Sequence, residues 1–148
     1  MNMNEEAQKA FLAVISALQL KSIQPLSIHF HRSDEQVHPG SEIKISWNQI
    51  FASDDPISQA PDVLIFRPKY TVTMLMDEKE LYYHETIIII AFSIIDKLSF
   101  EKAWENDEAR KIFHEKQIIK TLWPILRQQV LDGMTRLGLP GIPLPWII

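Results

Sequence analysis

The sequence predicts an α+β protein: a four-stranded antiparallel sheet with a long C-terminal helix and an extra N-terminal helix. Apolar residues have helical spacing over residues 5–18, alternate with polar ones over much of 26–95, and regain helical spacing near the C-terminus. The 148 residues suit one domain. We divide it into an N-terminal helix extension (1–20), an antiparallel sheet (21–96), a helical segment (100–138) and an extended apolar tail (139–148).

The first helix is expected over Glu5 to Leu18. Asn4 precedes it as a suitable N-cap, and the acids that follow favour the first turn. The apolar positions of this stretch form one predicted stripe: Phe11, Leu12, Val14, Ile15 and Leu18. We expect that stripe to be the buried face, covering a groove or a sheet face.

Period-two alternation predicts strands over 26–31, 43–48, about 63–76 and 82–95. A turn is expected at His38-Pro39-Gly40, a hairpin turn at 77–80 and a polar loop at 53–62. Pro68 interrupts the third strand, which indicates an edge position or a bulge. The run Ile87 to Ile90 places isoleucine on both faces of the fourth strand, so both faces should be covered, in part by another subunit.

A long helix is predicted near the C-terminus, where apolar residues follow i, i+3, i+4, i+7 spacing: Ile119, Leu122, Trp123, Leu126, Val130, Met134 and Leu137. Pro124 should kink this helix or start a new segment. Gly138 should end it, and Pro140 prevents its continuation. The residues beyond should be extended.

Composition argues against several classes of protein. The formal net charge of -4, without a block of basic residues, disfavours a nucleic-acid partner. The absence of cysteine excludes disulfides and thiolate chemistry, and the 4 glycines form no phosphate-binding loop, so no cofactor is expected. The N-terminus lacks the features of a signal peptide, and the longest apolar run is about half of a membrane span. We therefore expect a soluble cytoplasmic protein without membrane insertion.

Enzymatic chemistry finds little support in the sequence. His29 and His31 would share one face of a strand and could bind a metal ion with His38 or His84, but a solvated strand face is the simpler explanation, which we favour. The acidic pairs Asp54-Asp55 and Asp77-Glu78 fall in predicted loops, where acids commonly form turns. We expect a protein that is not an enzyme.

What remains is apolar surface. Ile50 and Phe51 adjoin the polar loop after the second predicted strand, where a deep core is not expected. Trp146, Ile147 and Ile148 are bulky apolar residues beyond the last helix, and such residues must dock on this subunit, on another subunit or on a ligand. Trp123, in contrast, falls on the helix stripe and is expected in the core.

Several segments then match a known family in order and spacing. They are Tyr70-Thr71-Val72-Thr73, Glu85 with Phe92-Ser93-Ile94, Trp123-Pro124-Ile125-Leu126-Arg127, Arg136, Pro140 and Leu144-Pro145. From about Ser22 to Leu144 the chain resembles the SecB family of export chaperones.

The resemblance implies dimers that pair into a tetramer, and ATP-independent holding of unfolded precursor polypeptides in apolar grooves. The matching candidate peptide-binding positions are Trp47, Ile50, Phe51, Leu144, Trp146, Ile147 and Ile148. The candidate positions for contact with the motor ATPase SecA are Tyr83 and Glu85.

The chain also departs from the family pattern. Ser27 and His31 stand where the family's first strand presents acids to SecA, which leaves SecA docking open. The second helix and acidic tail expected after the proline-containing stretch do not follow, so we expect the groove's lid and one motor contact to be missing. Alternatives are a chaperone dedicated to one client, such as an antitoxin, and an oligomeric small-ligand-binding or scaffold protein.

Overall fold

The computed structural model describes residues 4–146. Its elements follow one another as α1 (Glu5–Ala17), β1 (Leu18–Arg32), β2 (Ile43–Ile50), β3 (Ile57–Ala60), β4 (Val63–Phe66), β5 (Lys69–Met76), β6 (Lys79–Ile94), α2 (Lys97–Trp104), α3 (Asp107–Ile112), the π-helical turn η1 (Phe113–Gln117) and α4 (Ile118–Arg136). No helix within these residues is both long and apolar enough to cross a membrane.

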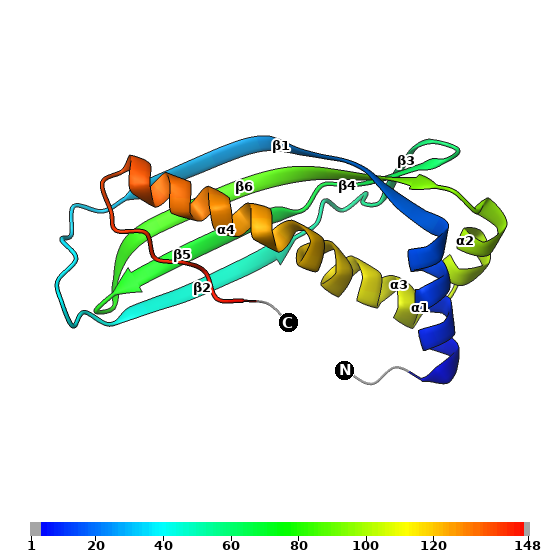
Figure 1. Ribbon diagram of the computed structural model, residues 1–148, viewed down its shortest axis with the longest axis horizontal. Helices are drawn as coiled ribbons and strands as arrows, with labels where there is room; N and C mark the ends of the chain where they lie inside the picture. The colour runs from blue at the N-terminus through cyan, green and yellow to red at the C-terminus, as the bar shows by residue number, and fades with distance from the viewer. Residues whose placement is uncertain (1–3, 147–148) are drawn as a thin grey trace.

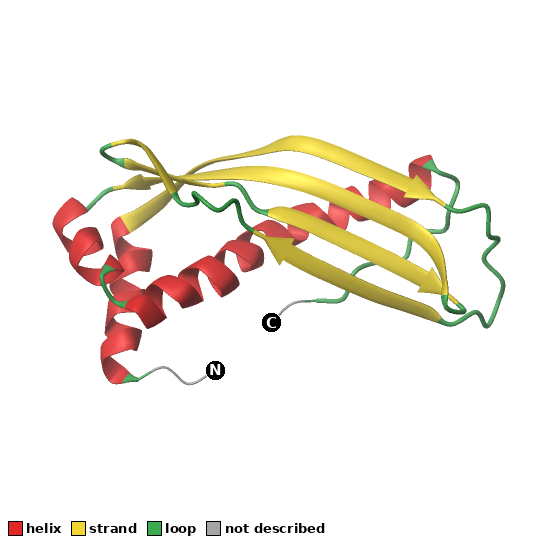
Figure 2. Cartoon of the chain, turned by 180° about the vertical axis from the view of Figure 1, so that it is seen from behind, coloured by secondary structure: helices red, strands yellow, loops and turns green. Residues whose placement is uncertain are grey.

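The strands form one antiparallel sheet in which β6 is the central element. Strands run in the order β2-β5-β6-β4-β3, and β1 pairs with the other edge of β6. Helix α4 lies along one face of the sheet, and α1, α2 and α3 gather at one end (Figure 1). Figure 2, seen from behind, shows the opposite face without a helix over it. We call these two faces the helix-facing side and the outer side.

This architecture confirms the predicted α+β class with its antiparallel sheet and two flanking helical parts. The predicted number of four strands is wrong, because the described residues contain six. The expected loop at 53–62 contains β3, and the expected strand 63–76 divides at Arg67 and Pro68 into β4 and β5. Both halves pair with β6, so Pro68 lies at a break inside the sheet and not on an edge.

Helix α1 begins where the sequence predicts, since the Asn4 side chain accepts a hydrogen bond from the Ala7 backbone N–H at 2.7 Å. Its predicted apolar stripe is only partly right. Val14 is buried, whereas Leu12 is 64% exposed and Ile15 is also exposed. The buried face is formed largely by alanines, because α1 packs against α2 and α3 and runs directly into β1 at Leu18.

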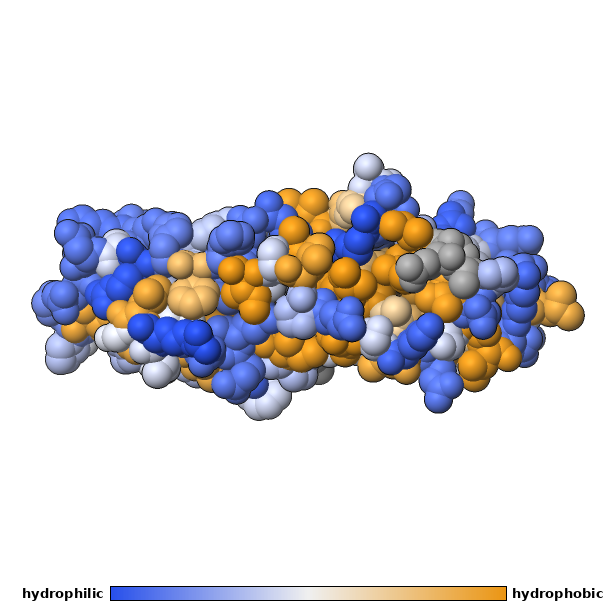
Figure 3. Space-filling model, turned by 90° about the horizontal axis from the view of Figure 1, so that it is seen from above, coloured by the Kyte–Doolittle hydropathy of each residue, from blue (hydrophilic) through white to orange (hydrophobic). Residues whose placement is uncertain are grey.

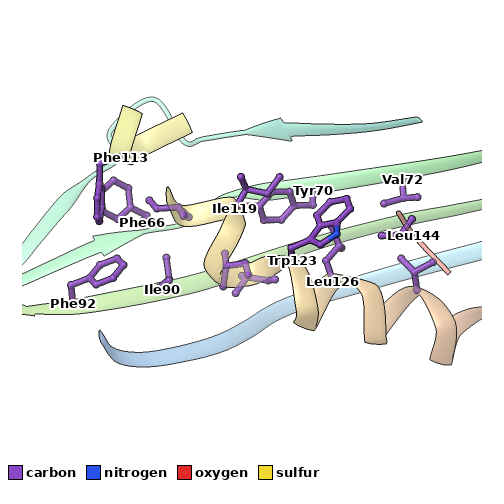
Figure 4. Packing of buried hydrophobic residues seen from close by; sticks show 14 of the residues in the cluster. Phe66, Tyr70, Val72, Ile90, Phe92, Phe113, Ile119, Trp123, Leu126 and Leu144 are labelled. Atoms are coloured by element: carbon purple, nitrogen blue, oxygen red, sulfur yellow. The ribbon is translucent and has the colours of Figure 1, made fainter. Parts of the chain in front are cut away.

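Helix α4 supplies the core that the sequence predicts. Its apolar stripe is buried against the helix-facing side of the sheet, and only Leu137, just after the helix, is half-buried. Figure 4 shows Trp123 and Leu126 directed toward Tyr70 and Val72 of β5. The helix continues through Pro124, so of the two expected effects of this proline, a kink or a new segment, the new segment does not occur.

Gly133 allows α4 to approach the sheet closely. A Cβ atom at this position would lie 2.2 Å from the Tyr82 hydroxyl oxygen and 3.2 Å from the Phe30 ring. Tyr82 is fully buried and its hydroxyl lies 2.9 Å from His84 Nδ1, so it cannot easily move away. A larger residue would push α4 from β1 and β6.

His84 is buried beneath α4, where its ring stacks on Phe30. Burial lowers the pKa of His84 from its ordinary value of 6.5, and the nearby Gln129 side chain, which can accept a hydrogen bond from the protonated ring, only partly opposes this shift. Burial also lowers the pKa of His114.

A lowered histidine pKa makes stability depend on pH. As the pH falls below about 6.5, the unfolded chain binds a proton at this position before the folded chain does, so the free energy of unfolding should decrease. We expect His84→Gln to lose less stability than the wild type between pH 7.5 and 5.5, measured by urea denaturation. His114 remains in both proteins, so some dependence persists. Parallel stability profiles for the two proteins would contradict this account.

Candidate functional site

The turn after α4 sends the chain back along the helix. Gly138 has a φ of +75°, its N–H donates to Thr135, and the Leu139 N–H donates to Met134. These two bonds form the Schellman motif that ends many helices. Leu139 is buried behind the turn, and the following residues run as an extended stretch beneath α4 (Figure 1).

Two side chains of α4 hold the main chain of this stretch. The Trp123 indole N–H donates to the Pro145 carbonyl oxygen at 2.8 Å, and Arg127 Nε donates to the Leu144 carbonyl oxygen at 3.0 Å. The Arg127 guanidinium also lies 4.0 Å from the centre of the Trp146 ring. Leu144 is 1% exposed, whereas Trp146 is 77% exposed. We call residues 144–146 the docked segment.

Trp47 of β2 lies on the same side of the sheet. It pairs with the buried Val72, so it points to the helix-facing side, and its ring centre lies 5.2 Å from that of Trp123. Trp47 is nonetheless 41% exposed. The structure therefore brings three predicted peptide-binding residues, Trp47, Leu144 and Trp146, to one apolar surface through Trp123 and Arg127. We call it the Trp47 surface.

The other predicted peptide-binding positions lie elsewhere. Ile50 pairs with Lys69 at the end of β2, and its odd spacing from Trp47 places it on the outer side. Phe51 is half-buried against Phe66 and His114, with ring centres 6.2 and 3.9 Å away. Ile147 and Ile148 lie outside the described residues.

Tyr83 and Glu85, the candidate motor contacts, stand side by side on the outer side of β6. The Tyr83 hydroxyl donates to Glu85 Oε2 at 3.0 Å, and Lys69 Nζ lies 3.3 Å from Glu85 Oε1. The hydrogen bond from Tyr83, together with Lys69, lowers the pKa of Glu85. His31 stacks on Tyr83 with 5.3 Å between ring centres. This polar cluster and the Trp47 surface thus lie on opposite faces of the sheet.

The histidines and acidic pairs that could have supported metal binding or catalysis take part in strand pairing, ion pairs and a turn. His29 pairs with Glu85 on the outer side, but no group of three or more histidines and acids that could hold a metal ion occurs within residues 4–146. Asp54 and Asp55 both form ion pairs with Arg67. Asp54 Oδ1 lies 2.5 Å from Arg67 Nη2, and Asp55 Oδ1 lies 3.1 Å from Arg67 Nε. Asp77 and Glu78 form the tight turn between β5 and β6, each with positive φ.

The sequence patterns did not identify Trp123 and Arg127 as the two donors of the Trp47 surface. Trp123 was expected only as a core residue, and Arg127 was singled out only as part of a family-like segment. Their spacing was a usable signal, because Trp123 and Arg127 are four residues apart and residues at i and i+4 lie on one face of a helix. An indole N–H and a guanidinium so placed can bind carbonyl groups of a neighbouring chain.

No family model and no curated protein sequence matches the chain. Among solved structures, the Mycobacterium tuberculosis Rv1957 SecB-like chaperone, in complex with a ChAD peptide from the Rv1956 HigA1 antitoxin, superposes with a TM-score of 0.71 at 14% identity. That match covers 96% of this chain and 99% of the other. A Streptococcus agalactiae protein of unknown function matches with a TM-score of 0.40 at 12% identity, over 87% of this chain and 97% of the other. The first comparison shows that the chain has a SecB-like fold, which bears out the resemblance.

The docking of the segment on α4 can be tested through Arg127. Arg127→Met removes a charged hydrogen-bond donor and the cation above Trp146, which should weaken docking by about 1.5–3 kcal/mol. We expect the Trp123 indole N–H signal in NMR spectra to lose its protection from solvent exchange. Arg136→Met, at the exposed end of the same helix, is the control and should leave that signal unchanged. Unchanged protection in Arg127→Met would show that Arg127 does not hold the segment.

Proposed function

Because the chain has the SecB-like fold, we propose that it is an ATP-independent holding chaperone and not an enzyme. It binds unfolded or precursor polypeptides through the Trp47 surface and keeps them competent for export. The observation that carries the proposal is the partly exposed Trp47 beside a stretch of extended chain whose main-chain carbonyls are held by α4. Hydrogen bonds to main-chain groups place little demand on the sequence of a client.

A second reading, that the chain serves one client such as an antitoxin, is supported by the similar Rv1957 chaperone, whose complex contains an antitoxin peptide. The two readings differ at the outer side. Export would use Tyr83 and Glu85 to contact SecA, so capture of SecA by the wild type but not by Glu85→Arg favours export. Binding of an antitoxin peptide without any capture of SecA favours the dedicated role.

The client surface is tested by two substitutions on one strand. Trp47→Ser should sharply reduce suppression of the aggregation of a denatured model protein, because an aromatic anchor contributes about 2 kcal/mol, roughly thirtyfold in Kd. Ile50→Ser is the matched control, since Ile50 is 50% exposed on the opposite face of β2. Equal effects of both substitutions would contradict the site, and failure of the wild type to protect would contradict the chaperone function.

We also propose that the protein is a homo-oligomer, a tetramer made as a dimer of dimers. Among the described strands, β1 pairs only with β6, so the other edge of this 15-residue strand is free to pair with a second copy. Its apolar residues Leu20, Leu26 and Ile28 are exposed. Seen from the β1 side, apolar residues gather along the middle of the molecule (Figure 3).

Light scattering tests this assembly. The wild type should have four times the mass of one chain, and Leu26→Lys combined with Ile28→Lys should lower the mass, because charges oppose burial of this edge. Leu98→Lys, at an 82% exposed position on α2, serves as the control and should keep the mass of the wild type. A wild-type monomer would rule the assembly out.

A further inference from the structure

We propose that the docked segment is an internal occupant of the client surface, and that the clients which displace it are extended, proline-containing segments carrying an aliphatic and an aromatic side chain. The inference rests on the proposed function and names its substrate class. Residues 144–146, Leu-Pro-Trp, then act as a covalently attached stand-in for a client.

The contacts of the segment are of a kind that a foreign chain can reproduce. Both hydrogen bonds from α4 end on main-chain carbonyl oxygens, those of Leu144 and Pro145. Every residue type carries such an oxygen, and both donors belong to α4. Neither hydrogen bond uses a backbone N–H of the segment, so proline is accepted at the central position.

The side chains of the segment set the rest of the specificity. Leu144 is buried beside Val72 and requires an aliphatic group at that position (Figure 4). The Arg127 guanidinium over the Trp146 ring favours an aromatic group two residues later. Proline between them keeps the backbone extended and lowers the entropy lost on binding. The surface thus fits an aliphatic-Pro-aromatic sequence.

The segment is held weakly enough to be exchanged. Trp146 is largely exposed, and among the described residues its ring stacks only on the Arg127 guanidinium. No carboxylate within residues 4–146 forms a salt bridge with Arg127, so Arg127 remains available to a client once the segment leaves. Leu139 is buried at the helix end, so the chain can stay anchored there while residues 144–146 leave.

The test measures binding of a fluorescent peptide, Gly-Ile-Pro-Leu-Pro-Trp, to the full chain by anisotropy. Leu144→Ser frees the surface but keeps both donors, so the peptide should bind about tenfold more tightly than to the wild type, because apparent affinity scales with the fraction of open surface. Trp146→Ala alters only an exposed side chain, cannot disturb the core, and should give a smaller gain in the same direction.

Further variants and a changed peptide distinguish failure of the internal-occupant proposal from failure of the chaperone proposal. The Arg127→Met variant should bind the peptide with lower affinity than the Leu144→Ser variant does, because it lacks one of the two donors. The Arg136→Met variant should bind the peptide with the affinity of the wild type. Replacing both prolines of the peptide by alanine should reduce its affinity. If the wild type suppresses aggregation but neither segment variant gains affinity, the internal-occupant proposal is wrong and the chaperone proposal stands. If the wild type shows no suppression, the chaperone proposal itself fails.

Discussion

The backbone of β6 is hydrogen-bonded along both edges, to β1 on one side and to β5 and β4 on the other. Its 16 residues therefore fix the register of three neighbouring strands at once. Because side chains alternate along a strand, this register also decides which residues face α4 and which face outward. A shift by one residue would move Tyr82, His84 and Ile88 out of the core.

The division into two faces gives the sheet two different surfaces. The helix-facing side buries aromatic and aliphatic residues under α4 and leaves Trp47 partly exposed at the β2 edge. The outer side combines the Tyr83, Glu85 and Lys69 cluster with the half-buried Ile87 and Ile89. Under the proposed function, a client on the first surface and a second protein on the other can bind at the same time, because the sheet separates them.

Local patterns predicted most of the sheet, the apolar stripe of α4 and the end of that helix. Period-two alternation indicates β5 and β6, and Gly138 followed by Pro140 indicates the end of α4, where the structure gives Gly138 a positive φ. The face of α1 was partly wrong because its contacts are with α2 and α3, whose packing no local pattern encodes. Strand β3 escaped detection because four residues within a polar stretch carry too little signal.

The site was predicted less completely than the fold. Trp47 and Ile50 stand three residues apart, and an odd spacing along a strand already implies opposite faces, so this separation was readable from sequence. The docking of residues 144–146 was not, because the path of an irregular segment depends on contacts with residues about twenty positions earlier, such as Trp123 and Arg127.

If the docked segment competes with clients as we propose, the Schellman turn at Gly138 has a consequence for which polypeptides can bind. It tethers the docked segment a few residues from its binding surface, and a short tether gives an effective local concentration of roughly millimolar. A free polypeptide at about 1 µM reaches equal occupancy only when it binds roughly a thousandfold more tightly than the segment does. The turn thereby sets an affinity threshold. Brief encounters with folded neighbours fall below this threshold, whereas long non-native chains that make several contacts at once exceed it.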